Sequence, residues 1–294
     1  TGAGTFRNIS FRGASLDLIG AASSAFPTVE NFADTTFLKG FSQISLRQQN
    51  LTFAQTILFF RGAGWGNQAP TQASGSAPGV SMLFRGVGLA PFAGRASVQF
   101  TNAPTFSGEG GGTGAQNRGI LPWAVVDLNY SGAFTSNLSF ATTGGTNSNI
   151  RSLDVPEYDV NPTAFGGTAQ GVVTNSNVLL TAASGASLAM TANTQRNSLT
   201  IEGDAGLALA DGVQFTLRSG GILVRPGSSS IITGGVLNQP AATTSTLNIW
   251  TFGDLSIRSA MAGGAGVGNG SPSLIKAGEA VSYTHLRAHE TKAN

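Results

Sequence analysis

The stretch that decides the fold is residues 199–224, which read LTIEGDAGLALADGVQFTLRSGGILV. It contains four pairs of apolar residues, and a single spacer separates the members of each pair: Leu199/Ile201, Leu207/Leu209, Phe215/Leu217 and Ile222/Val224. Alternation with a period of two predicts short strands that bury one face. Glycine, aspartate and serine fill the intervals, and these residues favour turns. Over the longer segment 172–258, turns are expected at Asn193–Asn197, Gly203–Gly206, Asp211-Gly212, Gly220-Gly221, Pro226-Gly227 and Gly234-Gly235. The stretch is therefore predicted to alternate between short strands and tight turns.

The spacing of the apolar pairs indicates stacked coils. Pairs begin at positions 188, 199, 207, 215, 222 and 247, so one longer period runs from position 199 to 222 and the next from 222 to 247. Periods above about 20 residues are typical of stacked repeats. We predict an all-β fold, a parallel β-helix (β-solenoid) of about 23–25 residues per coil. Leu199 should then pair with Ile222, Ile222 should pair near Leu247, and Leu207, Leu217 and Ile249 should point inward.

A β-sandwich or barrel is the alternative architecture, because strands in those folds also recur about every 8–12 residues. Charged residues make up 10% of this chain, compared with about a quarter in an average globular protein. The outer faces of the expected strands carry Ser, Thr, Ala and Asn instead. Short strands with uncharged outer faces favour the solenoid.

Composition also limits the function. The 294 residues include 40% hydrophobic residues, enough for a core, and the formal net charge of +2 offers no basic footprint for nucleic acid. No apolar run reaches the roughly 18 residues of a membrane helix, so we expect no transmembrane segment in this fragment. Cysteine is absent, which excludes disulfides, thiolate catalysis and cysteine-based metal sites.

The last fourteen residues differ from the rest. Val281–Asn294 reads VSYTHLRAHETKAN and contains both histidines of the chain, His285 and His289. Up to Thr291 this segment resembles one translated frame of a sequencing-library adaptor, so we interpret residues 281–294 as a non-native tail. The alternative is a His-x3-His metal or catalytic site. Residues 1–280 contain neither histidine nor cysteine, a composition that points away from enzymes.

We divide the chain into an N-terminal β-rich part (1–130) with Gly-rich loop insertions at 61–80 and 107–119, regular coils at 131–280, and the tail. Because the first residue is Thr1 and the earliest methionine is Met82, we interpret the chain as a fragment or a processed product. In the first part strands are expected at Thr5–Phe11, Ser15–Ile19, Gln43–Leu46, Asn50–Phe53, Ile57–Phe60, Ser81–Arg85, Ala96–Phe100 and Ile120–Val126. No helix is expected anywhere.

Several motifs resemble those of one family. Phe84-Arg85-Gly86, Thr101–Thr105 (TNAPT), Ile120–Val125 (ILPWAV) and the repeat-like opening Leu274–Glu279 (LIKAGE) resemble large bacterial surface proteins with autotransporter-associated β-strand repeats. The resemblance covers most of residues 80–279. It implies a secreted or surface-displayed passenger with a parallel β-helix and no assigned catalytic residues. The repeat opening stops at the adaptor-like tail, so we expect an uncapped end that permits end-to-end self-association.

Two groups of carboxylates could supply the acid pair of a glycosidase, Glu202/Asp204/Asp211 and Asp154/Glu157/Asp159. Glycines flank Asp204 and Asp211, a context that favours turn or surface roles. The Gly-rich residues 108–114 lack the Lys-Ser/Thr of a P-loop, and Gly263–Gly270 lacks the aspartate that would bind calcium. We therefore predict no catalytic, cofactor or metal residues.

The tryptophans are the remaining candidates for binding. Trp65 lies among glycines and is the candidate carbohydrate contact, whereas Trp123 and Trp250 lie in apolar segments typical of a core. We interpret the chain as a structural or adhesive passenger segment, not an enzyme, located outside the cell or on the bacterial cell surface. Its expected partners are a polysaccharide or a host or cell surface. The alternatives are a fragment of a β-helix polysaccharide-degrading enzyme and a carbohydrate-binding module centred on Trp65.

Overall fold

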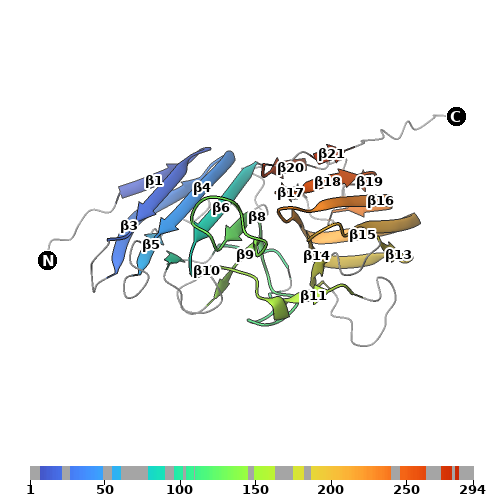
Figure 1. Ribbon diagram of the computed structural model, residues 1–294, viewed down its shortest axis with the longest axis horizontal. Coiled ribbons are helices and arrows are strands. Elements are labelled where there is room, and N and C mark those ends of the chain that lie inside the picture. The colour runs from blue at the N-terminus through green and yellow to red at the C-terminus, as the bar shows by residue number, and fades with distance from the viewer. Residues whose placement is uncertain are drawn as a thin grey trace.

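The computed structural model describes residues 7–21, 27–48, 55–60, 79–89, 96–101, 104–108, 110–144, 149–162, 175–181, 187–239, 246–262, 273–279 and 282–284. The chain is all-β, as expected, and most of its strands pair in parallel (Figure 1). Helical structure in the described residues is limited to one short 3-10 turn, η3 (Val155–Glu157). The strands form two groups, which we call the N-terminal stack (β1–β10) and the C-terminal stack (β11–β21).

The N-terminal stack alternates between two sheets. One sheet contains β1 (Arg7–Phe11), β3 (Thr28–Phe37), β5 (Thr56–Phe60) and β7 (Ala96–Phe100), and the other contains β2 (Ser15–Ile19), β4 (Gly40–Arg47), β6 (Val80–Gly86) and β8 (Leu121–Asp127). Each strand pairs in parallel with the next strand of its own sheet. One step of the register runs from Phe11 to Phe37, and a longer one runs from Met82 to Ala124. The longer step spans the second segment that the sequence identifies as a loop insertion.

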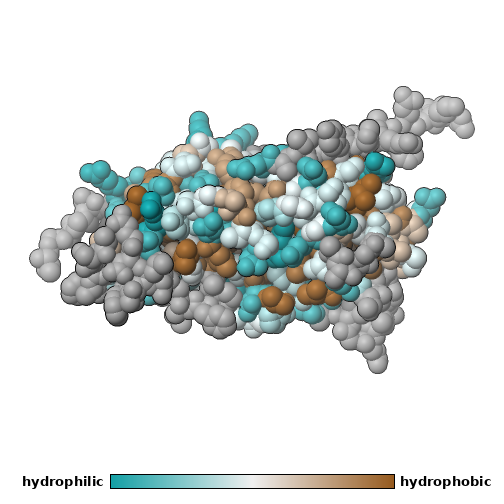
Figure 2. Space-filling view, viewed as in Figure 1, coloured by the Kyte–Doolittle hydropathy of each residue, from teal (hydrophilic) through white to brown (hydrophobic). Residues whose placement is uncertain are grey.

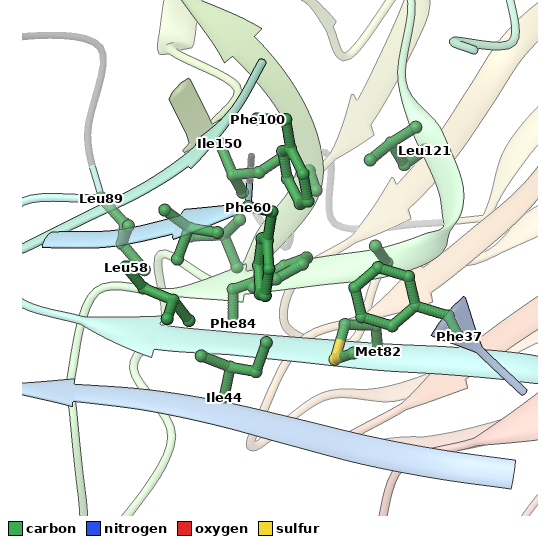
Figure 3. Packing of buried hydrophobic residues seen from close by; sticks show 14 of the residues in the cluster. Phe37, Ile44, Leu58, Phe60, Met82, Phe84, Leu89, Phe100, Leu121 and Ile150 are labelled. Atoms are coloured by element: carbon green, nitrogen blue, oxygen red, sulfur yellow. The ribbon is translucent and has the colours of Figure 1, made fainter. Parts of the chain in front are cut away.

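Aromatic side chains fill the space between these two sheets. The ring of Phe11 stacks on Phe37 at 5.3 Å between centroids, and Phe60 stacks on Phe100 at 5.0 Å. Figure 3 shows Phe60 and Phe84 meeting in this core, above Ile44 of β4. Inward residues of the two sheets therefore form one continuous core.

An antiparallel segment follows the parallel strands of this stack. The strands β9 (Ser139–Gly144) and β10 (Asn149–Ser152) pair antiparallel, and β9 also pairs antiparallel with β8. Ile150 is buried in the same core, and Ser152 N donates to Leu89 O at 3.0 Å. Here the structure departs from the parallel pairing that we expected, because β10 folds back over the end of the core. The sheet thus continues to Ser152, beyond the expected boundary at residue 130, although whether the two parts are separate domains stays a prediction.

The C-terminal stack consists of three parallel ladders. Its strands are β11 (Tyr158–Val160), β12 (Asn177–Leu180), β13 (Leu188–Met190), β14 (Thr194–Ile201), β15 (Leu207–Val224), β16 (Ser229–Asn238), β17 (Thr246–Thr251), β18 (Asp254–Ile257), β19 (Ala260–Ala262), β20 (Ser273–Ala277) and β21 (Ser282–Thr284). One ladder runs β11-β12-β14-β15-β17-β20, the second β13-β15-β16-β18-β21, and the third β14-β15-β16-β19. Long strands such as β15 contribute to all three ladders.

The register of these ladders comes close to the expected spacing of 23–25 residues without matching it throughout. Leu199 pairs with Ile222, and Ile222 pairs with Ile249 of β17. Both parallel pairings were expected, although the second falls at Ile249 and not at Leu247 itself. The interior positions are confirmed as well, because Leu207, Leu217 and Ile249 are at most 1% exposed. The spacing of apolar pairs therefore identified the inward columns correctly.

The turns between ladders differ from the expectation. We expected Asp211-Gly212, Gly220-Gly221 and Gly234-Gly235 to separate short strands, but all three lie inside the continuous strands β15 and β16. The strands change direction at Gly220 and Gly234, whose φ angles are +70° and +72°. A Cβ added at Gly220 would collide with Thr246 O, and one at Gly234 would collide with Leu209 O, each on the neighbouring coil. A corner with this close stacking requires glycine.

Two other expectations need correction. The turn expected at Asn193–Asn197 is largely part of strand β14. Strand β3, with the sequence TVENFADTTF, was not expected, because polar residues interrupt its apolar alternation. The strands expected at Ser15–Ile19 and Ala96–Phe100 are found with those bounds, whereas the one expected at Asn50–Phe53 lies outside the described residues.

The outer faces of the two stacks pack against each other. Leu83, Val125 and Phe140 from the N-terminal stack share a buried cluster with Leu223 and Trp250 from the C-terminal stack. In Figure 1 the strands of the first stack follow one another from left to right, whereas those of the second follow from bottom to top. The coils therefore do not form a single straight column. On the face shown in Figure 2, hydrophobic atoms gather in small patches among polar ones.

A pair of glycine substitutions tests the close stacking at the corners. Gly212 has a positive φ (+75°) like Gly234, but a Cβ there would meet nothing within 4 Å. We expect Gly212→Ala to lower the free energy of unfolding by about 1–2 kcal/mol, the cost of a left-handed alanine. Gly234→Ala should cost clearly more, because its Cβ also collides with Leu209 O. Urea denaturation measures both variants, and equal losses would show that the corner is not closely stacked.

Candidate functional site

The tryptophans and histidines that were weighed as binding residues lie in three kinds of place. Trp65 and the histidines His285 and His289 fall outside the described residues. Trp123 is buried in the core of the N-terminal stack, and Trp250 is buried between the stacks, where its Nε1 donates to Pro122 O at 2.9 Å. The core role expected for these two tryptophans is confirmed.

The first carboxylate group does not converge on one point. Asp204 and Asp211 are exposed, in agreement with the turn or surface role expected for them. Glu202 Oε2 instead accepts from Arg225 Nη1 at 2.8 Å, and the glutamate side chain is 39% exposed. Arg225 also donates through Nε to Leu138 O of the N-terminal stack at 2.9 Å. This ion pair therefore helps to join the stacks.

The second carboxylate group contains the most buried acid. Glu157 lies in the turn η3 but is 0% exposed, so a surface location is wrong at this position. Arg151 forms two parallel hydrogen bonds with it, Nη1 to Oε2 at 2.7 Å and Nη2 to Oε1 at 2.6 Å. Bidentate pairs of this kind are the strongest ionic hydrogen bonds in proteins. Asp159, by contrast, is half-buried and accepts from Ser176.

Local sequence positions Glu157 for this contact. Asp154 and Glu157 form a capping box at η3, in which Asp154 N donates to Glu157 Oε2 at 2.9 Å. An acid followed three residues later by glutamate, with Pro156 between them, is a recognisable cap signature. The pattern was thus present in the sequence, but the arginine partner could not be read from it.

The Gly-rich loop insertion supplies a further hydrogen bond to this acid. Gly114 N donates to Glu157 Oε1 at 3.0 Å, and Arg118 Nη1 donates to Gly111 O at 2.9 Å. Arg118 also donates through Nη2 to Thr143 O at 2.7 Å. The N–H group of Gly114 therefore binds a carboxylate of this same chain. The loop is held in place by these contacts at both of its ends.

The ionisation of these groups follows from their surroundings. Burial acts to raise the pKa of Glu157, but hydrogen bonds from Arg151, Asp154 N and Gly114 N outweigh it, so the pKa lies below its ordinary value. Burial lowers the pKa of Arg118, and the nearby charge of Arg151 lowers it further. Near neutral pH, Glu157 therefore carries its negative charge and cannot act as a general acid.

Asparagine side chains tie the same loop to the C-terminal stack. Asn177 Nδ2 donates to Arg118 O at 2.9 Å, and Asn197 Nδ2 donates to the same oxygen at 3.1 Å. The backbone N–H of Asn177 also donates to Gln116 O at 2.7 Å. Asn177 Oδ1 in turn accepts from Asn197 Nδ2 at 2.8 Å. Residues 110–119 thus link the carboxylate of Glu157, strand β9 and strands β12 and β14 of the C-terminal stack. We call the four residues Gly114, Arg118, Arg151 and Glu157 the junction clamp.

A second buried ion pair organises a neighbouring loop. Arg85 Nη2 donates to Asp127 Oδ2 at 2.8 Å, and both side chains are almost fully buried. The same guanidinium donates to Asn129 O and Gly132 O, both at 3.0 Å. Asp127 Oδ1 accepts from Thr135 Oγ1 at 2.8 Å. Residues 127–135 are therefore wrapped around Arg85.

In the part of the chain that the structure describes, no group of three or more acidic, histidine or cysteine side chains is placed to hold a metal ion. The described helical residues include no segment that is long and apolar enough to span a membrane. Comparisons with protein families, curated proteins and solved structures find no match for this chain. The class that the structure defines is an all-β protein with parallel sheets, whose buried charges connect two stacks.

Replacement of Glu157 tests the junction clamp. At pH 7, Glu157→Gln should lower the free energy of unfolding by about 3–5 kcal/mol, because it leaves the buried charge of Arg151 uncompensated. Glu157 has a lower pKa in the folded than in the unfolded protein, so its charge stabilises the folded state at pH values above the unfolded pKa of about 4.3. This stabilisation is lost as the pH falls through the folded pKa. The gap between wild type and variant should therefore shrink in acid.

Urea denaturation between pH 7 and pH 3 measures this gap. Glu202→Gln is the control, because its carboxylate is 39% exposed and its ion pair should therefore contribute about 1 kcal/mol or less. A constant gap across that pH range would contradict the assigned role of Glu157.

Proposed function

We propose that residues 1–280 form a parallel β-helix that serves as a structural or adhesive passenger segment of a secreted or surface-displayed bacterial protein. The observation that carries the proposal is the column Leu199–Ile222–Ile249, in which each residue pairs in parallel with its equivalent on the next coil. Stacking of this kind adds about 4.8 Å of length for every coil. The proposed location outside the cell rests on the family resemblance described above.

The charged residues of the described region support a structural role. Glu157, Asp127 and Glu202 each form an ion pair with an arginine. The first two are buried and accept several further hydrogen bonds. Acids held in this way fix the position of loops and sheets. We propose that their role in this chain is to maintain the arrangement of the stacks.

Engineered disulfides test the proposed coils. Gln195 of β14 pairs with Thr216 of β15, one coil later. Adjacent parallel strands bring such residues to about 4.8 Å, within the Cα range of a disulfide. We expect Gln195→Cys/Thr216→Cys to oxidise to an intramolecular disulfide, which is easily detected because the natural chain has no cysteine.

The matched control is Gln195→Cys/Arg218→Cys, in which the second cysteine is displaced by two residues along the strand. The diagonal distance of about 7–8 Å should prevent a bond without distortion. Mass spectrometry of the oxidised proteins measures both yields. A register-matched pair that oxidises no better than the displaced pair would rule out the proposed coil.

Absence of catalysis is tested separately. We expect the purified chain to release no reducing sugar from plant or algal polysaccharides, because residues 1–280 contain no histidine or cysteine and Asp204 and Asp211 are exposed. A colorimetric assay of reducing ends measures the release. Sugar release that disappears in Asp204→Asn would identify the chain as an enzyme and overturn the proposal.

A further inference from the structure

A connected row of aromatic rings lies beside the contact between the two stacks. Phe41 of β4 lies 6.2 Å from Trp250, Trp250 lies parallel to Phe252 at 6.3 Å, and Phe252 meets Phe134 at 4.6 Å, all between ring centroids. Phe41 is 43% exposed, and Phe134 and Phe252 are half-buried. Tyr130, also half-buried, belongs to the same loop as Phe134. We call Phe41, Tyr130, Phe134, Trp250 and Phe252 the aromatic strip.

Buried contacts hold the strip in place from beneath. Trp250 is 1% exposed, and its Nε1 donates to Pro122 O. The guanidinium of Arg85 lies 4.6 Å from the centroid of Phe134 and is itself held by Asp127. Because these supports are buried and hydrogen-bonded, the exposed rings lose little conformational freedom when a ligand binds.

Polar side chains accompany the rings on the outer face of β2 and β4. Ile44 and Leu46 point into the core, so Phe41, Gln43 and Arg47 lie on the opposite, outer face. The guanidinium of Arg47 lies over Tyr130, 5.3 Å from its ring centroid. Asp17 of β2 is exposed on the same face, since β2 pairs in register with β4.

The charges of this face indicate the kind of partner. Asp17 and Arg47 are opposite charges, so the face carries no net charge that would attract a polyanion or an anionic lipid surface. Rings interleaved with amide, carboxylate and guanidinium groups offer both apolar faces and hydrogen-bonding groups. A sugar chain presents the same combination of C–H faces and hydroxyl groups. The strand from Phe41 to Arg47 extends about 20 Å, which accommodates several sugar rings.

We propose that the aromatic strip, together with the outer face of β4, is a binding surface for a neutral polysaccharide. The inference rests on the adhesive role proposed above and assigns that role to a surface. Trp65, the carbohydrate contact expected from the sequence, lies outside the described residues.

The test is native gel electrophoresis of the full chain through gels that contain cellulose derivatives, amylose, xylan or β-glucan. We expect retardation by at least one of these neutral polymers. Phe41→Ser and Tyr130→Ser should each weaken the apparent affinity about tenfold, the loss expected for one ring contact. The matched control is Val155→Ser, which removes an exposed apolar side chain (69% exposed) from outside the strip and should leave retardation unchanged.

Circular dichroism establishes that each variant is folded. Retardation by none of the neutral polymers overturns the proposal, as does retardation by polygalacturonate alone or an equal loss in Val155→Ser. Loss in Trp65→Ser with no loss in Phe41→Ser or Tyr130→Ser would also overturn it, and would transfer the site to Trp65. If the chain does not bind a polysaccharide but the Gln195/Thr216 disulfide still forms, the proposed binding surface is refuted and the proposed β-helix is not. If only the disulfide fails to form, the proposed β-helix is refuted.

Discussion

The backbone pairing between parallel strands is the constraint on which the C-terminal stack depends. Parallel strands lie about 4.8 Å apart, so every strand must place a residue of suitable size directly beside its partner on the next strand. Interior positions therefore repeat as apolar columns, such as Leu199, Ile222 and Ile249. Corner positions leave no room for a Cβ where a carbonyl of the neighbouring strand lies against them, as at Gly220. The abundance of glycine and the scarcity of charge both fit this constraint.

The buried ion pairs of this molecule position loops rather than strands. The bidentate pair of Arg151 and Glu157 accepts an additional N–H from the loop at Gly114. A buried carboxylate without such partners would be costly, so the pair specifies where the loop must lie. Arg85 and Asp127 act in the same way for residues 127–135. Each pair positions a loop that would otherwise have few apolar anchors.

The loops in turn position the contact between the stacks. Residues 110–119 extend from the N-terminal stack to Asn177 and Asn197 at the start of the C-terminal stack. Residues 127–135 bring Phe134 against Phe252 at the end of β17. A long Gly-rich insertion is thus used to connect one stack to the next.

The sequence by itself determined the all-β class and the inward residues, because the alternation of apolar and polar residues is a local property of a strand. Glycine also marked the corners at Gly220 and Gly234, although the strands continue through them, and the insertion at 107–119. The tertiary structure alone decided where parallel stacking stops, since β10 folds back onto the core through Ile150. It likewise decided the partners of Glu157 and the neighbours of Trp250, whose indole N–H reaches the distant carbonyl of Pro122. Such contacts depend on how two distant faces pack, and no local pattern in the chain records that choice.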